Sequence, residues 1–116
     1  MRILICGSRD WDNHKKIESE FEKSIPKDSV IIHGGAKGAD SIADSIARKL
    51  GFKVEVYKAE WDKYGKSAGM IRNYEMLNSG VDRVLAFWDE KSPGTSHMID
   101  IVRRRGDINL TIIYNR

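Results

Sequence analysis

The sequence predicts one α/β domain built on a five-stranded parallel sheet, with helices on both faces. Two patterns predict this fold class. Short runs rich in Val, Ile and Leu alternate with longer segments whose apolar residues recur at helical spacing, which is typical of repeated βα units. Several runs are apolar almost throughout, as expected of strands covered on both faces. The chain has 116 residues, enough for one such domain, residues 1–116, and too few for a second.

The predicted strands are short, and proline or glycine interrupts the segments between them. Pro26 lies before the second strand, and Pro93 lies just before the last helix, where a proline is tolerated. We expect strands at residues 2–6, 29–33, 53–57, 83–88 and 109–114.

Four intervening segments each carry an apolar stripe that predicts an amphipathic helix. Three of these stripes end close to a glycine, namely Gly51, Gly80 or Gly106, and glycine is favoured just after a helix. The stripes consist of Ile17 and Phe21; of Ile42, Ile46 and Leu50; of Met70, Tyr74 and Leu77; and of Met98, Ile101 and Val102.

Right-handed crossovers between such units lead to a Rossmann-like, doubly wound sheet with the strand order 3-2-1-4-5. The order reverses between strands one and four. Ligands of open parallel sheets bind beside that reversal, at the carboxyl ends of the strands. We therefore expect the loops after strands one, two and four to bind the ligand.

Composition narrows the function classes. Lys and Arg exceed Asp and Glu by 20 to 17, and this scattered excess does not by itself indicate nucleic-acid binding. No apolar run is long enough to cross a membrane and no signal-peptide pattern is visible, so we expect a cytoplasmic protein. The single cysteine, Cys6, excludes an intrachain disulfide and lies in an apolar run typical of a core. The sequence predicts no metal site and no cofactor.

The loops after strands one and two combine glycines with polar residues. Gly7 allows a sharp turn, Ser8 offers a hydroxyl, and Arg9 can form paired hydrogen bonds to phosphate. After strand two, three glycines within five residues precede a helix, so that backbone N–H groups can converge on an anion. The spacing is neither the Walker A nor the dinucleotide pattern. In this segment we predict ligand contacts for Gly34, Gly35, Ala36, Lys37, Gly38 and Asp40.

Two further sets complete the predicted site. Gly94 permits close approach of a ligand, and Thr95 and Ser96 place hydroxyls beside the free N–H groups of the last helix. On the third helix, Arg72 and Asn73 are polar within an otherwise apolar stretch. Simple helix capping by Thr95 and a solvated Arg72 are the competing interpretations.

His33 is the imidazole beside the glycine segment. Since no acidic residue is obviously placed to orient it, a hydrogen-bonded structural role is favoured over a catalytic one.

In combination, four motifs resemble the YspA-like branch of the SLOG superfamily. They occur in the same order from near residue 3 to near residue 114 and are specific as a set. The resemblance implies a Rossmann-like fold, a nucleotide-related ligand and a capacity to form homo-oligomers. The superfamily also includes the LOG phosphoribohydrolases, the DNA-processing DprA proteins and sensor domains. The motifs are Gly7-Ser8-Arg9, residues 33–40, residues 68–73 and residues 92–95.

The LOG enzymes combine an Arg-Lys pair on the third helix with a glycine-rich loop and, three residues after its threonine, a catalytic glutamate. Arg72 matches the arginine, and Gly94 and Thr95 match the end of the loop. Asn73 replaces the lysine, and Met98 stands at the glutamate position. A thioether has no proton to give or accept, so the resemblance favours binding over hydrolysis.

Three functions follow from these features. Binding or sensing of a phosphorylated, nucleotide-derived small molecule comes first. N-glycosidic cleavage of a nucleoside 5′-monophosphate is the alternative, and it needs a substitute carboxylate, for which the candidates are Asp40, Asp89 and Glu90. Single-stranded nucleic-acid binding ranks third, because its stacking aromatics lie on separate elements: Trp11, Trp61 and Trp88.

Overall fold

The computed structural model describes residues 1–115 and contains a five-stranded parallel sheet in the order β3-β2-β1-β4-β5. The predicted fold class and strand order are therefore confirmed. The strands are β1 (Arg2–Gly7), β2 (Val30–His33), β3 (Lys53–Val56), β4 (Arg83–Trp88) and β5 (Asn109–Tyr114). The helices are α1 (His14–Lys23), α2 (Ala39–Lys49), α3 (Trp61–Tyr64), α4 (Ala68–Leu77) and α5 (Pro93–Arg105), and a 3₁₀ turn, η1 (Gly65–Ser67), joins α3 to α4.

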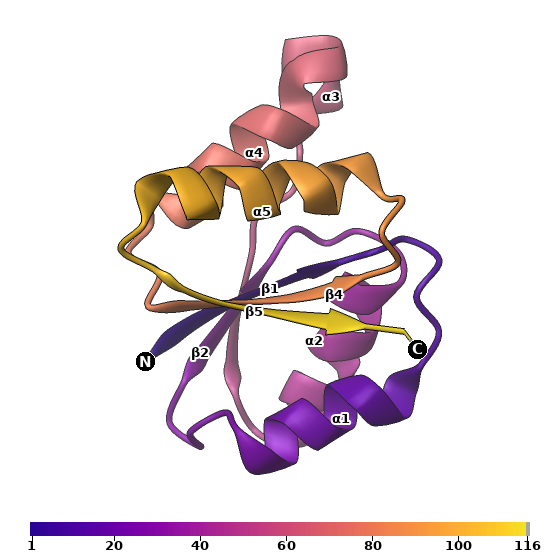
Figure 1. Cartoon of the computed structure of the whole chain (residues 1–116), viewed down its shortest axis with the longest axis vertical. Helices are drawn as coiled ribbons and strands as arrows, with labels where there is room; N and C mark the ends of the chain where they lie inside the picture. Colours follow the sequence, from indigo (N-terminus) through magenta and orange to yellow (C-terminus); the bar gives the residue numbers. More distant parts are fainter. Residues whose placement is uncertain (116) are drawn as a thin grey trace.

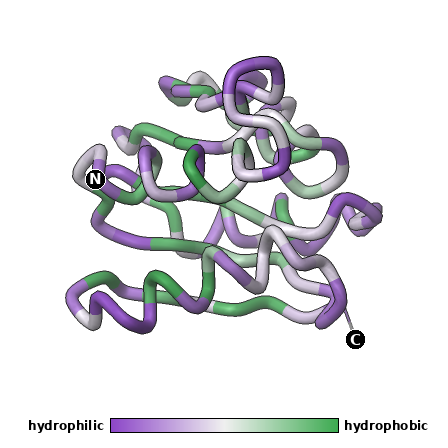
Figure 2. Tube along the Cα trace, turned by 90° about the horizontal axis from the view of Figure 1, so that it is seen from above, coloured by the Kyte–Doolittle hydropathy of each residue, from purple (hydrophilic) through white to green (hydrophobic). Residues whose placement is uncertain are grey.

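Helices cover both faces of the sheet. Figure 1 shows α1 and α2 on one face and α4 and α5 on the other, with α3 projecting beyond α4. Ile3 and Ile5 of β1 are buried in the cluster with α1 and α2, whereas Leu4 and Cys6 are buried in the cluster with α4 and α5. This division follows from the alternation of side chains along a strand. Hydrophobic stretches recur between hydrophilic ones along the whole trace (Figure 2).

The strand register brings three loops together. Leu4 of the central strand β1 pairs with Ile32 of β2 on one side and with Val84 of β4 on the other. Since all strands run in one direction, the loops that follow β1, β2 and β4 leave the same edge of the sheet. Within residues 1–115, no helix has the length and apolar character needed to cross a membrane.

Helix α4 differs from the predicted stripe. Leu77 is buried as expected, but Met70 is 52% exposed and Tyr74 is 47% exposed, so the prediction was wrong for these two side chains. The helix instead buries Ala68 and Asn73 on the face that includes Leu77. A polar residue can occupy this face because its amide finds hydrogen-bond partners on α5 and on the neighbouring Arg72.

Candidate ligand-binding pocket

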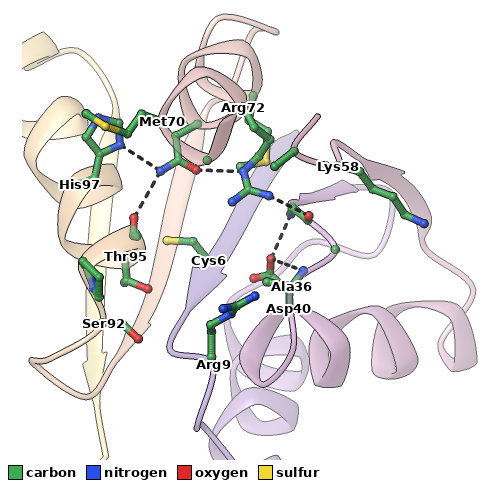
Figure 3. Close-up of a pocket in the computed structure, with 18 of the residues that line it drawn as sticks. Cys6, Arg9, Ala36, Asp40, Lys58, Met70, Arg72, Ser92, Thr95 and His97 are labelled. Atoms are coloured by element: carbon green, nitrogen blue, oxygen red, sulfur yellow. Dashed lines mark hydrogen bonds between the residues drawn. The ribbon is translucent and has the colours of Figure 1, made fainter. Parts of the chain in front are cut away.

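A pocket of about 790 Å³ opens at the carboxyl edge of the sheet, between the loops after β1, β2 and β4 and helix α4. It lies at the reversal of strand order between β1 and β4, where doubly wound sheets bind their ligands. Figure 3 shows side chains from these separate segments facing one another across it. Most of the site residues predicted from the sequence line it, namely Gly7, Arg9, Gly34, Gly35, Ala36, Asp40, Arg72, Asn73, Gly94 and Thr95.

Four predicted residues do not line the pocket: Ser8, Lys37, Gly38 and Ser96. Lys37 and Ser96 are exposed. Ser8 is fully buried, and its hydroxyl accepts a hydrogen bond from the backbone N–H of Asp89 at 2.9 Å. Its carbonyl accepts from the N–H of Ala39 at 3.2 Å. Ser8 therefore fastens the loops after β1 and β4 to the start of α2.

Two glycines lie in close contact with neighbouring groups. A Cβ on Gly34 would lie 2.5 Å from Nη1 of Arg72, so a larger residue there would displace the guanidinium from its present position. Gly38 has a φ of +78°, and a Cβ there would collide with the backbone carbonyls of Ser8 and Arg9. Gly38 thus lets the start of α2 rest directly on the loop after β1.

The backbone N–H groups of the glycine segment donate to side chains of the same region. Those of Gly34 and Ala36 donate to Oδ2 of Asp40 at 3.1 and 3.2 Å. The N–H of Gly35 donates to Nδ1 of His33 at 3.0 Å. The sequence interpretation assigned these three groups to an anionic ligand. In the structure a carboxylate of the protein itself takes the anion's place, because α2 begins one residue before Asp40 and turns its side chain back toward the loop.

His33 is hydrogen-bonded to the glycine segment but lies outside the pocket. It is buried, it does not line the pocket, and its Nε2 lies 2.8 Å from Oδ1 of Asp44. Since Nδ1 accepts from Gly35, the ring proton resides on Nε2 and is donated to Asp44. Asp44 is partly buried, which opposes its charge, but hydrogen bonds from Arg48 and His33 hold its pKa below the usual range. The structure thus places an orienting carboxylate that the sequence interpretation did not identify, and the geometry fits a structural histidine.

Arg72 enters the pocket from α4. Its Nη1 donates to the carbonyl of Gly34 at 2.9 Å, and its Nε donates to Oδ1 of Asn73 at 3.2 Å. Burial lowers the pKa of Arg72, while the nearby carboxyl of Asp40 opposes that effect. Because a guanidinium remains charged throughout the physiological range, this side chain brings a fixed positive charge to the pocket. Arg9, from the loop after β1, points toward the same region (Figure 3).

Asn73 links α4 to α5. Its Nδ2 donates to the carbonyl of Gly94 at 3.3 Å and to Nδ1 of His97 at 3.0 Å. Burial lowers the pKa of His97, so its ring is neutral near pH 7. With both ends of its amide engaged, Asn73 holds Arg72 and the start of α5 in position.

The start of α5 faces the pocket with its positive end. Within the described residues no side chain caps this helix, and its first turn contains no acidic residue. Thr95 is buried on the pocket wall, and Pro93 and Gly94 form the rim. Asp89 accepts hydrogen bonds from the N–H groups of Ser92 and Lys91, which lower its pKa and hold the turn before the helix. The remaining N–H groups of the first turn are available to an anion.

Two side chains at the base of the pocket complete it. Asp40 is only 5% exposed, and burial raises its pKa, opposed by the hydrogen bond from Ala36 and the charge of Arg72. Burial also raises the pKa of the Cys6 thiol, so Cys6 stays protonated and does not act as a nucleophile. Within residues 1–115, no group of His, Cys, Asp and Glu side chains is arranged to hold a metal ion.

The segment after β3 contributes residues that the sequence interpretation missed. Lys58, Trp61 and Lys66 line the pocket, and Trp61 is 57% exposed. The signal was available, since the loop after β3 leaves the same edge of the sheet and carries an aromatic residue between lysines. These residues were not predicted, because β3 lies at the edge of the sheet, away from the strand reversal between β1 and β4. Other lining residues that were not predicted are Cys6, Ala59, Gly69, Met70, Met76, Ser92, Pro93 and His97.

A five-stranded parallel sheet in this order, with helices on both faces and a pocket at its strand reversal, defines a Rossmann-like α/β protein. The chain belongs to the YspA, cpYpsA-related SLOG family, whose model matches residues 1–64. It is also similar to the Gene 61 protein of Mycobacterium phage D29, with 41% identity over 114 residues that cover 90% of each chain. The resemblance derived from the motifs is therefore confirmed.

Proposed function

We propose that this protein binds a phosphorylated nucleoside in the pocket at the carboxyl edge of the sheet. The observation that carries the proposal is the convergence of Arg9, Arg72 and the uncapped start of α5 on one cavity. Its volume of about 790 Å³ falls within the usual range for small-molecule sites. Membership of the SLOG family supports a nucleotide-related ligand.

The pocket has two chemically different ends. The start of α5 and Arg9 supply N–H donors and positive charge, so we assign the phosphate to this end. Trp61 and Met70 are exposed side chains that line the same pocket from α3 and α4, and we assign the planar base to them. We propose a small molecule as the partner. A cytoplasmic location and a homo-oligomeric state stay predictions.

N-glycosidic cleavage is the second candidate, because a buried carboxyl, that of Asp40, lies near Arg72 in the same pocket. The residue at the position of the LOG glutamate does not support cleavage. Met98 is fully buried in the cluster between the sheet and α5, and it does not line the pocket. Chromatography of the protein after incubation with adenosine 5′-monophosphate distinguishes the two functions, since cleavage releases free base.

We expect adenosine 5′-monophosphate or ADP-ribose to raise the melting temperature, because a ligand that binds only the folded state stabilises it. Unphosphorylated adenosine should raise it less. Arg9→Ala should weaken phosphate-dependent binding by about 10- to 100-fold, the effect of a hydrogen bond to a charged group. Thermal shift and calorimetric titration measure both quantities.

The matched control for this experiment is Arg103→Ala, since Arg103 is an exposed arginine at the far end of α5 and does not line the pocket. It should bind like the wild type. If no phosphorylated nucleoside shifts the melting temperature, the proposed function is wrong.

We expect a bound base to change tryptophan fluorescence through Trp61. Trp11 is buried, whereas Trp61 is exposed on the pocket wall. Loss of one base–aromatic stack costs about 1–3 kcal/mol, so Trp61→Ala should weaken nucleotide binding about 5- to 100-fold and abolish most of the signal. Trp61→Phe should retain most of the affinity. Tyr64→Ala is the control, because Tyr64 is exposed on the same helix but does not line the pocket. If Trp61→Ala bound the nucleotide as tightly as the wild type, Trp61 would not belong to the binding site.

A further inference from the structure

One carboxylate oxygen of Asp40 has no hydrogen-bond partner among the described residues. Its Oδ2 accepts from the N–H groups of Gly34 and Ala36, while its Oδ1 is buried and unpaired. The carboxyl group lies at the base of the pocket, and Figure 3 shows it beside Cys6 and Arg9 and below Arg72. A buried acceptor without a partner is destabilising, so such an oxygen in a binding pocket points to a donor on the ligand.

A phosphate does not suit this position. A second anion would lie against a carboxyl group whose pKa burial has already raised, and the two like charges would repel. The N–H groups that would hold a phosphate on the glycine segment already donate to Asp40 and His33. The base of the pocket therefore fits a neutral hydrogen-bond donor, and the anionic end of the ligand belongs at the start of α5.

A hydroxyl group meets these requirements. It donates one hydrogen bond, it carries no charge, and it is small enough to fit beside a buried oxygen. In a phosphorylated nucleoside, hydroxyls are carried by the ribose, between the phosphate and the base. In the pocket, Asp40 likewise lies in the floor, with the start of α5 to one side (Figure 3).

We propose that Oδ1 of Asp40 accepts a hydrogen bond from a sugar hydroxyl of the ligand and thereby selects ribonucleotides over their deoxygenated analogues. This inference rests on the proposed function. It makes Asp40 a specificity-determining residue. The glycine segment then has a different task from phosphate binding, since its N–H groups hold the carboxylate in the orientation that presents Oδ1.

Asp40→Asn tests this directly. The N–H groups of Gly34 and Ala36 need an acceptor, so the asparagine oxygen must face them and its NH₂ group must face the pocket. The variant keeps the shape and the loop hydrogen bonds but turns an acceptor into a donor. It also removes a carboxyl group that burial disfavours in its charged form, so the fold should persist.

The experiment is calorimetric titration with adenosine 5′-monophosphate, 2′,3′-dideoxyadenosine 5′-monophosphate and adenosine. We expect the wild type to prefer the ribonucleotide over the dideoxynucleotide by about 10- to 100-fold, as for a hydrogen bond to a charged group. In Asp40→Asn this preference should fall several-fold, because a neutral amide bonds a hydroxyl more weakly than a carboxylate does, while the advantage of the monophosphate over adenosine remains. In Arg9→Ala the ribonucleotide preference should remain, while the advantage of the monophosphate over adenosine should fall.

The outcomes separate the two proposals. If the wild type binds both monophosphates equally well, the assignment of Asp40 is overturned and the proposed function stands. The same conclusion follows if Asp40→Asn keeps the ribonucleotide preference of the wild type undiminished. If neither the monophosphates nor ADP-ribose bind the wild type, the proposed function fails and this inference with it. The comparison within the wild type remains decisive even if the variant does not fold.

Discussion

Met98→Glu is expected to destabilise the fold strongly and not to create a hydrolase. Met98 is 0% exposed and packs in the apolar cluster with Leu4 and Met76. A carboxylate without partners in such a cluster costs several kcal/mol, which we put at more than about 4 kcal/mol here, a large fraction of the roughly 5–15 kcal/mol that stabilise a typical domain. Urea denaturation followed by circular dichroism measures the loss.

Met98→Leu is the matched control, because it conserves volume and should cost less than about 1.5 kcal/mol. A Met98→Glu variant that melts like the wild type and releases base from adenosine 5′-monophosphate would contradict both the packing and the functional assignment. The residue that α5 presents to the pocket is His97, one position earlier. The motif comparison identified the missing glutamate, and the structure adds that this position faces the core.

Gly38→Ala is the second variant for which we expect a large effect. At Gly38 the backbone has φ +78° and ψ −125°, which L side chains rarely adopt, and a Cβ would collide with the backbone of Ser8 and Arg9. Backbone strain of about 1–3 kcal/mol and overpacking of about 1–3 kcal/mol together predict a loss of roughly 2–6 kcal/mol in the free energy of unfolding. Chemical denaturation gives this value.

Gly65→Ala separates the two causes. Gly65 has nearly the same backbone conformation, φ 58° and ψ −134°, but a Cβ there would meet nothing within 4 Å. This variant should therefore lose only the strain component. Equal losses in the two variants would show that the start of α2 does not rest tightly on the loop after β1.

The fold could be predicted from the sequence because each local signal agrees with the architecture. Strands such as β1 and β4 are almost continuously apolar, and a glycine or proline marks most of the boundaries. The predicted stripes were wrong at Leu50, which is 53% exposed and follows the last residue of α2, and at Met70 and Tyr74 of α4. The buried face of α4 includes Asn73, whose amide is satisfied by groups on α5 and by Arg72, and such partners are invisible to a periodicity argument.

For the candidate site, the sequence could predict which loops meet, since parallel strands bring their carboxyl ends to one edge. It could not predict what the N–H groups of the glycine segment would bind. That depends on the side chain of Asp40 turning back from α2 and on the pairing of His33 with Asp44 across the loop. The place of Trp61 in the pocket was not predicted, because the strand reversal points to the loops after β1, β2 and β4 and not to the segment after β3.

The position of β1 at the centre of the sheet also has a consequence for folding. Ile3 pairs with Arg83, so the first strand finds one of its two neighbours only after most of the chain has been made. Parallel strands cannot form a local hairpin, and sheets dominated by such distant contacts fold slowly for their length. The loop after β4 closes the pocket, so the binding site exists only once this late pairing is complete. Amide hydrogen exchange in β1, which is paired on both sides, should therefore follow global unfolding and not local fraying.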